Sequence, residues 1–231
     1  GKLAPLIIPS EVTGGTGLMN PSILIDGDEI LCILRHINYS LYHSENNQRF
    51  PSIWGPLSYL HPEQDQHLRT TNYLCRLNPD FTVKDYALIE MMNLHEPIWE
   101  FVGLEDGRLT KWNGKFYMSG VRRDTTVNGQ GRVEVCELDV DWENNRVREV
   151  SRQRVEVENT ASYCEKNYAP ILDRPFEFVT ENGLTLTLLL ANFCATKLVV
   201  TYGKVKKLLE PSEPFAKFCE LIALLFVLFM L

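Results

Sequence analysis

The sequence predicts an all-β protein, and two hairpins with the same organisation carry most of this prediction. In the first, short apolar runs flank Asp26-Gly27-Asp28, and in the second they flank Asn113-Gly114. Asn-Gly favours the type I′ turn of a tight hairpin because both of its residues tolerate a positive φ. Apolar runs bounded by such turns are typical of antiparallel strands. The four strands expected from these hairpins are residues 22–25, 29–35, 108–112 and 115–120.

Further strand signals follow the two hairpins in chain order. Residues 72–77 follow the first hairpin at a distance, and residues 132–138 follow the second in the same way. By contrast, residues 39–66 are polar and aromatic and are interrupted by three prolines, which predicts a long surface loop. Later segments with strand character are residues 147–157, 176–187, 184–190 and 197–202.

A short polar motif introduces each hairpin, and a third motif of this kind occurs later in the chain. The three are Asn20-Pro21-Ser22, Glu105-Asp106-Gly107-Arg108 and Lys166-Asn167-Tyr168-Ala169-Pro170. Repeated strand groups with one leading motif each are typical of blades arranged around a common axis. We therefore predict a β-propeller of the five-bladed type, truncated to three or four blades in this chain. Residues 1–179 are assigned to these blades, and residues 180–231 to a further blade and an apolar tail.

Composition and charge narrow the classes of partner. The net charge is −7 and most basic residues are scattered, so no footprint for nucleic acid is expected. The six cysteines form no CxxC pair and several lie inside apolar strand patterns, which favours free thiols in a reducing, cytoplasmic compartment. The five histidines show no metal-ligand spacing, so no metal site is expected. The apolar run 221–231 is far shorter than the roughly 20 residues that span a bilayer, so a membrane is not an expected partner.

The densest group of residues suited to catalysis lies between Glu100 and Asp124. An antiparallel hairpin brings residues 105–108 and 122–124 to the same end of a sheet, which places acids beside guanidinium groups. Arginine binds planar anions in a bidentate way, and a neighbouring carboxyl group can exchange a proton. The alternative is that these charges form structural ion pairs at the strand ends. Charge pattern alone leaves both interpretations open.

Three motifs resemble one family of carbohydrate-active enzymes. The segment Gly103-Leu104-Glu105-Asp106-Gly107-Arg108-Leu109 resembles the Glu-Asp-Pro-Arg signature of glycoside hydrolase family 130, with Gly107 in place of the proline. Asn20-Pro21-Ser22-Ile23, followed by Arg35, resembles the first-blade pattern of that family, and residues 165–170 resemble a later-blade motif. The similarity covers residues 18–179, with the motifs in the family's order. Members of the family are five-bladed β-propellers that phosphorolyse or hydrolyse β-mannosides.

The resemblance implies roles for individual residues. Asp106 matches the general acid, whose proton reaches the glycosidic oxygen through a sugar hydroxyl while phosphate or water attacks from the opposite face. Either Arg122 or Arg123 falls where the family has an anion-binding arginine. No organic cofactor is implied, and inorganic phosphate is the possible co-substrate. The residues implied to hold substrate or phosphate are Asn20, Arg35, Glu105, Arg108, Lys166 and Asn167.

Three functions remain open at this point. The first is an inverting glycoside phosphorylase or hydrolase, that is, a transferase or a glycosidase, with a glycoside or oligosaccharide as its partner. The second is a non-catalytic sugar-binding propeller module of a larger glycan-processing protein. The third is a degenerate or truncated propeller without a closed site. Missing blades supplied by a longer chain, or an oligomer, are the expected partners in addition to the saccharide.

Overall fold

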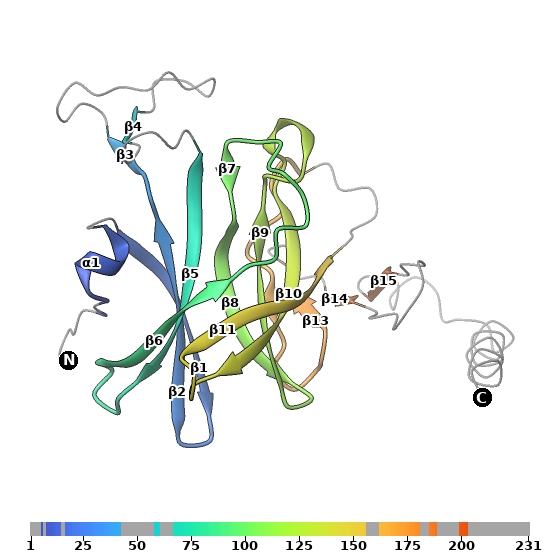
Figure 1. Ribbon diagram of the computed structural model, residues 1–231. Coiled ribbons are helices and arrows are strands. Elements are labelled where there is room, and N and C mark those ends of the chain that lie inside the picture. The colour runs from blue at the N-terminus through green and yellow to red at the C-terminus, as the bar shows by residue number, and fades with distance from the viewer. Residues whose placement is uncertain are drawn as a thin grey trace, which may run out of the picture.

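The computed structural model describes residues 6, 8–14, 17–42, 58–60, 67–155, 162–180, 185–188 and 199–202. Strands β1 to β15 dominate this part of the chain, beside one short helix, α1 (Ser10–Thr13), and a single 3-10 turn, η2 (Val127–Gly129). The prediction of an all-β protein is confirmed (Figure 1). None of the helices in the described segments is long and apolar enough to cross a membrane.

Two antiparallel groups of four strands form most of the molecule. The first strand group consists of β1 (Leu18–Asp26), β2 (Glu29–Ile37), β5 (Leu68–Leu77) and β6 (Val83–Glu90). The second strand group consists of β8 (Leu104–Trp112), β9 (Lys115–Arg122), β10 (Arg132–Asp141) and β11 (Arg146–Arg154). In each group the strands are neighbours in chain order, as in a simple meander.

The two groups join into one nearly closed, barrel-like sheet. On one side β6 and β11 pair in parallel through only two residue pairs, Val147 with Ile89 and Arg148 with Glu90. On the other side β1 and β8 lie next to each other, and the backbone N–H of Leu109 donates to Oγ of Ser22 at 3.0 Å. In Figure 1 the blue-to-teal strands and the green-to-yellow strands accordingly stand side by side. The arrangement of these strands as propeller blades stays a prediction.

A third strand group follows in the chain. It contains β12 (Ala169–Pro170), β13 (Glu177–Val179), β14 (Thr185–Leu188) and β15 (Val199–Tyr202), again antiparallel and in chain order. The segment 176–187, predicted as strand, thus holds two strands. Two shorter pairings complete the sheets: β7 (Phe101–Val102) runs parallel to β5, and β3 (Ser40–Tyr42) pairs with β4 (Ser58–Leu60).

Both predicted hairpin turns are present. Asn113 and Gly114 have φ values of 51° and 78°, as a type I′ turn requires, and Gly27 has a φ of 61°. The segment predicted as a surface loop begins differently from the prediction, because Tyr39 is buried. Trp54 and the other residues of 43–57 and 61–66 lie outside the described residues, as does the apolar run 221–231.

The second strand group is packed on both of its faces. One face shares an apolar core with the first group, built from side chains such as Leu31, Leu74 and Met118. The other face forms a core with the third group, in which Trp112 packs against Phe178 and donates from Nε1 to the carbonyl of Ile171 at 2.9 Å. Each fully buried side chain of this size stabilises the fold by roughly 1.5–3 kcal/mol relative to exposure. The aromatic residues of the second hairpin therefore belong to the core.

Candidate functional site

Strands β1 and β8 are each interrupted by a bulge at the same place. The pairing register shifts between Met19 and Ser22 in β1, and between Glu105 and Arg108 in β8. The residue inside each bulge has a left-handed backbone: φ is 49° at Asn20 and 54° at Asp106. Asn and Asp are the non-glycine residues that tolerate this conformation best. Asn167, two residues before β12, has the same conformation with a φ of 60°.

The bulge in β8 places two acidic side chains against one arginine. In a regular strand, successive side chains point to opposite faces of the sheet. Here Asp106 accepts a hydrogen bond from Nη1 of Arg35 at 2.7 Å, and Oε2 of Glu105 lies 3.6 Å from Nη2 of the same guanidinium. Because Asp106 has a left-handed backbone, the side chains of Glu105 and Asp106 both contact Arg35. Gly107 follows directly, and a Cβ at that position would lie 2.9 Å from Sδ of Met118.

Asp106 also joins the first and second strand groups. Its Oδ1 accepts hydrogen bonds from both Asn20 and Arg35, which come from β1 and β2. Within the described part of the chain its Oδ2 has no hydrogen-bond partner. The Asp106 side chain is 34% exposed, whereas that of Arg35 is only 8% exposed. The carboxylate is therefore held by a buried arginine and an exposed amide, while its other oxygen has no hydrogen-bond partner among the described residues.

Glu105 lies between two guanidinium groups. Besides its contact with Arg35, its Oε1 lies 3.7 Å from Nε of Arg123. The pKa of Glu105 is raised above its ordinary value, and burial is the main cause. The charge of Asp106 raises the pKa further, while Arg35, Arg123 and Lys166 act in the opposite direction. We call Asn20, Arg35, Glu105, Asp106 and Arg123 the carboxylate cluster.

Two buried hydroxyl groups that were not predicted from the sequence also contact Arg35. Its Nη2 lies 3.3 Å from Oγ1 of Thr70 and 3.4 Å from the hydroxyl of Tyr39. Both residues are buried, and burial raises the pKa of Tyr39. Neither belongs to a motif. The only sequence signal for Tyr39 is its place four residues after Arg35, directly beyond the end of β2.

Arg122 and Arg123 point to different surroundings. Arg123 belongs to the carboxylate cluster, and its guanidinium also lies near the rings of Phe101 and Tyr163. The Nε of Arg122 instead lies 3.1 Å from Oε2 of Glu134, and its Nη1 lies 3.2 Å from Oδ2 of Asp124. The structure thus separates the two arginines that the sequence left as alternatives.

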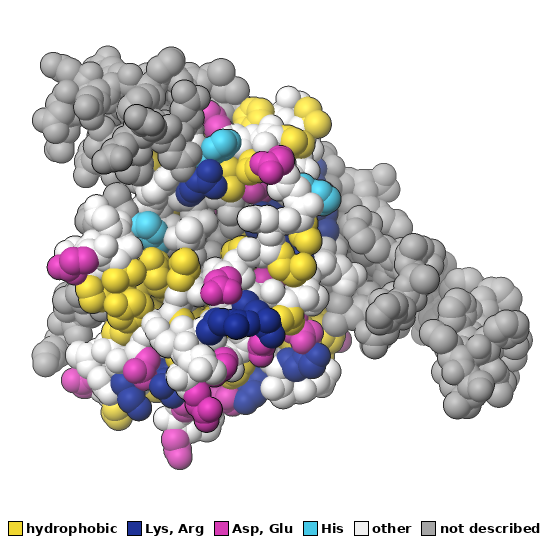
Figure 2. Space-filling view, in the orientation of Figure 1, with side chains coloured by type: hydrophobic (Ala, Val, Ile, Leu, Met, Phe, Trp, Pro, Cys, Tyr) yellow, Lys and Arg dark blue, Asp and Glu magenta, His cyan; other side chains and the backbone are white. Residues whose placement is uncertain are grey.

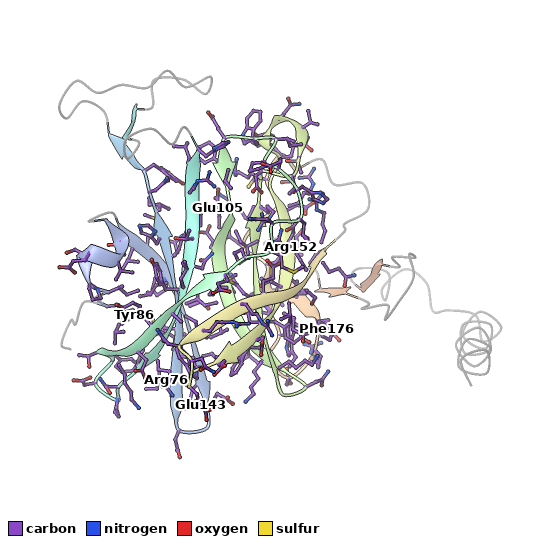
Figure 3. The ribbon with its side chains drawn as sticks, in the orientation of Figure 1. Arg76, Tyr86, Glu105, Glu143, Arg152 and Phe176 are labelled. Carbon is purple, nitrogen blue, oxygen red and sulfur yellow. The ribbon has the colours of Figure 1, made fainter. Side chains whose placement is uncertain are left out.

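Arg122 belongs to a second group of charges, which is more deeply buried. In it Arg152 bonds Glu149 at 2.5 Å, and Arg154 bonds Glu134 at 3.1 Å. We call this group the buried charge network; its members are Arg122, Asp124, Glu134, Glu149, Arg152 and Arg154. Figure 3 labels Glu105 near the upper ends of β5 and β8, and Arg152 on β11. Sequence reasoning missed Glu134, Glu149 and Arg152, because charged residues in strands usually face solvent.

Two cavities adjoin these groups. A small one of about 10 Å³ is lined by Asp106, Arg108, Ser119 and Asn167, together with apolar side chains. A larger one of about 670 Å³ lies between the first and second strand groups, and Arg122, Asp124 and Arg152 form part of its lining. In the larger cavity Arg122 pairs with Asp124, and Arg152 pairs with Glu149, whereas Asp106, which lines the small one, has an oxygen without a hydrogen-bond partner among the described residues.

Other predicted features contribute little chemistry. Lys166 is exposed and near enough to Glu105 to lower its pKa, but it forms no ion pair with the described residues. Cys32, Cys75 and Cys136 are free and buried, as expected for small apolar side chains. In the described part of the chain, His, Cys, Asp and Glu side chains form no group of three that could hold a metal ion. Acidic and basic side chains are interspersed over the lower part of the face in Figure 2, consistent with surface pairs such as Arg148 with Asp139 at 2.7 Å.

The carboxylate cluster combines groups that suit hydroxylated and anionic ligands. Carboxylate oxygens accept hydrogen bonds from hydroxyl groups, and guanidinium groups donate to anions. A carboxyl group with a raised pKa can also retain a proton at a pH where an ordinary glutamate has lost it. Comparison of the chain with protein-family models, with curated proteins and with solved structures found no match.

Proposed function

We propose that this chain is a carbohydrate-active β-propeller and that the carboxylate cluster is the centre of its sugar site. The reaction class is inverting phosphorolysis or hydrolysis of a glycoside of the β-mannoside kind, with Asp106 as the general acid. The resemblance of three motifs to glycoside hydrolase family 130 supplies the reaction class. The geometry of the site supports the assignment of residues.

The arrangement of the strand groups supports the propeller. Three antiparallel groups of four strands follow one another in the chain, each in the order of a meander. At the start of each group stands a residue with a left-handed backbone, namely Asn20, Asp106 or Asn167. Equivalent groups with equivalent entry points are what repeated blades require.

One observation carries the site assignment: two neighbouring carboxyl groups from one strand group meet an arginine and an amide from another. Asp106 is fixed through Oδ1 by Arg35 and Asn20, so Oδ2 is available to a ligand. Because burial raises the pKa of Glu105, that residue can hold a proton beside Asp106. In the proposed reaction Asp106 gives its proton toward the glycosidic oxygen, and Arg123 with Lys166 attracts an anionic nucleophile.

The test is release of free sugar or sugar 1-phosphate from a panel of β-mannosides, with and without inorganic phosphate. Replacing the acid by an amide in Asp106→Asn is expected to lower turnover about 10²- to 10⁴-fold, the usual share of a general acid. Turnover that requires phosphate identifies a phosphorylase, and turnover without it identifies a hydrolase. Turnover that persists unchanged in Asp106→Asn would refute the role of Asp106.

A second candidate function is a sugar-binding module without catalysis. It is favoured by the ion pair of Asp106 with Arg35, because a carboxylate neutralised in this way is well suited to accept hydrogen bonds from sugar hydroxyls. In that case a folded chain binds saccharides without cleaving them. Calorimetric titration of the same β-mannosides, beside the turnover assay, separates the two functions, because the module binds saccharides in wild type and in Asp106→Asn without cleaving them, whereas the enzyme cleaves them and loses turnover in Asp106→Asn.

A further inference from the structure

The small cavity beside Asp106 lies between the second and third strand groups. Arg108 and Ser119 lie directly opposite each other in the pairing of β8 with β9, so their side chains share one face of the sheet. Val121 and Val133 complete the apolar part of the lining on that face, and Asn167 and Tyr168 close the cavity from the segment before β12. The volume of about 10 Å³ corresponds to the lower limit for one water molecule.

Several polar groups that line this cavity lack a partner among the described residues. The hydroxyl of Ser119 has none, although Ser119 is only 2% exposed. The side chains of Arg108 and Asn167 form no hydrogen bond or ion pair with the described residues, and Oδ2 of Asp106 has none either. A buried hydroxyl without a hydrogen-bond partner destabilises the folded chain, and native proteins rarely contain one.

We propose that this cavity is the site of one ordered water molecule that bonds Ser119 and Asp106 and joins the second strand group to Asn167. A water needs two to four polar partners and about the space measured here, and the lining offers donors and acceptors together. Oγ of Ser119 can both donate and accept, Oδ2 of Asp106 accepts, and Arg108 and the amide of Asn167 donate. The water completes the hydrogen bonding of Asp106 on the side that Arg35 and Asn20 leave open. This site does not depend on the reaction proposed above.

The direct test is a crystal structure at a resolution that locates ordered water. The expected result is a density peak in the cavity at about 2.7–3.2 Å from Oγ of Ser119 and from Oδ2 of Asp106 or the amide of Asn167. A well-ordered cavity without such a peak overturns the proposal. Because the readout is density, the outcome is independent of any sugar or turnover.

A pair of variants provides the second test. Ser119→Ala removes a partner of the water, so its melting temperature is expected to fall. Thr110→Val is the matched control, because Thr110 lies in the same hairpin, is 1% exposed and has an unpartnered hydroxyl, but does not line the cavity. Removing that hydroxyl is expected to leave the melting temperature unchanged or to raise it. If Ser119→Ala behaves like Thr110→Val, the hydroxyl of Ser119 has no water partner and the proposal fails.

Discussion

The carboxylate cluster and the buried charge network are built from the same residue types, yet they differ in their access to solvent. In the network, Arg152 and Glu149 pair at 2.5 Å with side-chain exposures of 6% and 0%. In the cluster, Arg35 is buried to a similar degree, but its partner Asp106 is 34% exposed. Every acid of the network has an arginine partner, as Asp106 does, but Asp106 is more exposed and its Oδ2 has no hydrogen-bond partner among the described residues.

This difference separates a structural role from a binding role. In the network each acid is ion-paired with an arginine, so a ligand would have to displace an existing ion pair. In the carboxylate cluster one oxygen of Asp106 is held by Arg35 and Asn20 while the other stays without a hydrogen-bond partner among the described residues, and such positioning prepares a group for binding. Clusters of acids and arginines are therefore distinguished by their exposed oxygens and not by their composition.

The largest expected effect is in the buried charge network. Arg152→Met leaves Glu149 without a cation, whereas Glu134 keeps Arg122 and Arg154, and breaking the buried pair with Glu149 is expected to lower the free energy of unfolding by about 3–5 kcal/mol. Arg148→Met is the matched control on the same strand, because its ion pair with Asp139 is about half exposed and contributes less than about 1 kcal/mol. Urea denaturation measures both. Equal effects of the two changes would show that burial does not strengthen the ion pairs of the network.

A smaller effect is expected at Asp106, where backbone conformation and charge can be separated. Asp106→Asn keeps a residue type that tolerates a positive φ, so the free energy of unfolding should change by less than about 1 kcal/mol. Asp106→Ala loses that tolerance and should cost about 1–2 kcal/mol, the usual penalty of a left-handed residue. Urea denaturation of both variants is the measurement. An alanine variant as stable as the asparagine variant contradicts the strained bulge.

The smallest effect is a change of stability with pH that comes from Glu105. Because its pKa is raised in the folded state, the folded chain holds this proton more tightly than the unfolded chain does. Its contribution to stability is therefore full below the unfolded pKa and is lost as the pH rises through the folded pKa. Relative to Glu105→Gln, the wild-type chain should lose stability as the pH rises above the ordinary glutamate pKa of about 4.3. The measurement is urea denaturation of both chains at several pH values. If the difference in their free energies of unfolding stays constant as the pH rises, the pKa of Glu105 is ordinary.

The hairpins could be predicted from the sequence, because their turns carry a local signal. Asp26-Gly27 and Asn113-Gly114 mark tight turns whatever the rest of the chain does, and both turns are present. Strand β6 was missed, since Lys84, Asp85 and Glu90 interrupt its apolar pattern. Its position beside β5 depends on long-range pairing that no local pattern reveals.

The candidate site was predictable only in part. The motifs single out Asn20, Arg35 and Asp106, and the structure brings these three residues together. Which of two adjacent arginines lies beside Glu105 could not be read from the chain, because one residue of register decides which face each side chain occupies. The buried charge network was not predicted because its ion pairs depend on the register between strands. The partners of Glu134 come from β9 and β11, on both sides of its own strand.

The left-handed residues of β1 and β8 also couple the two strand groups mechanically. Asn20 and Asp106 stand 86 residues apart, occupy the same place in equivalent bulges and bond to each other. A change of backbone conformation in either bulge therefore displaces the hydrogen-bond partner of the other.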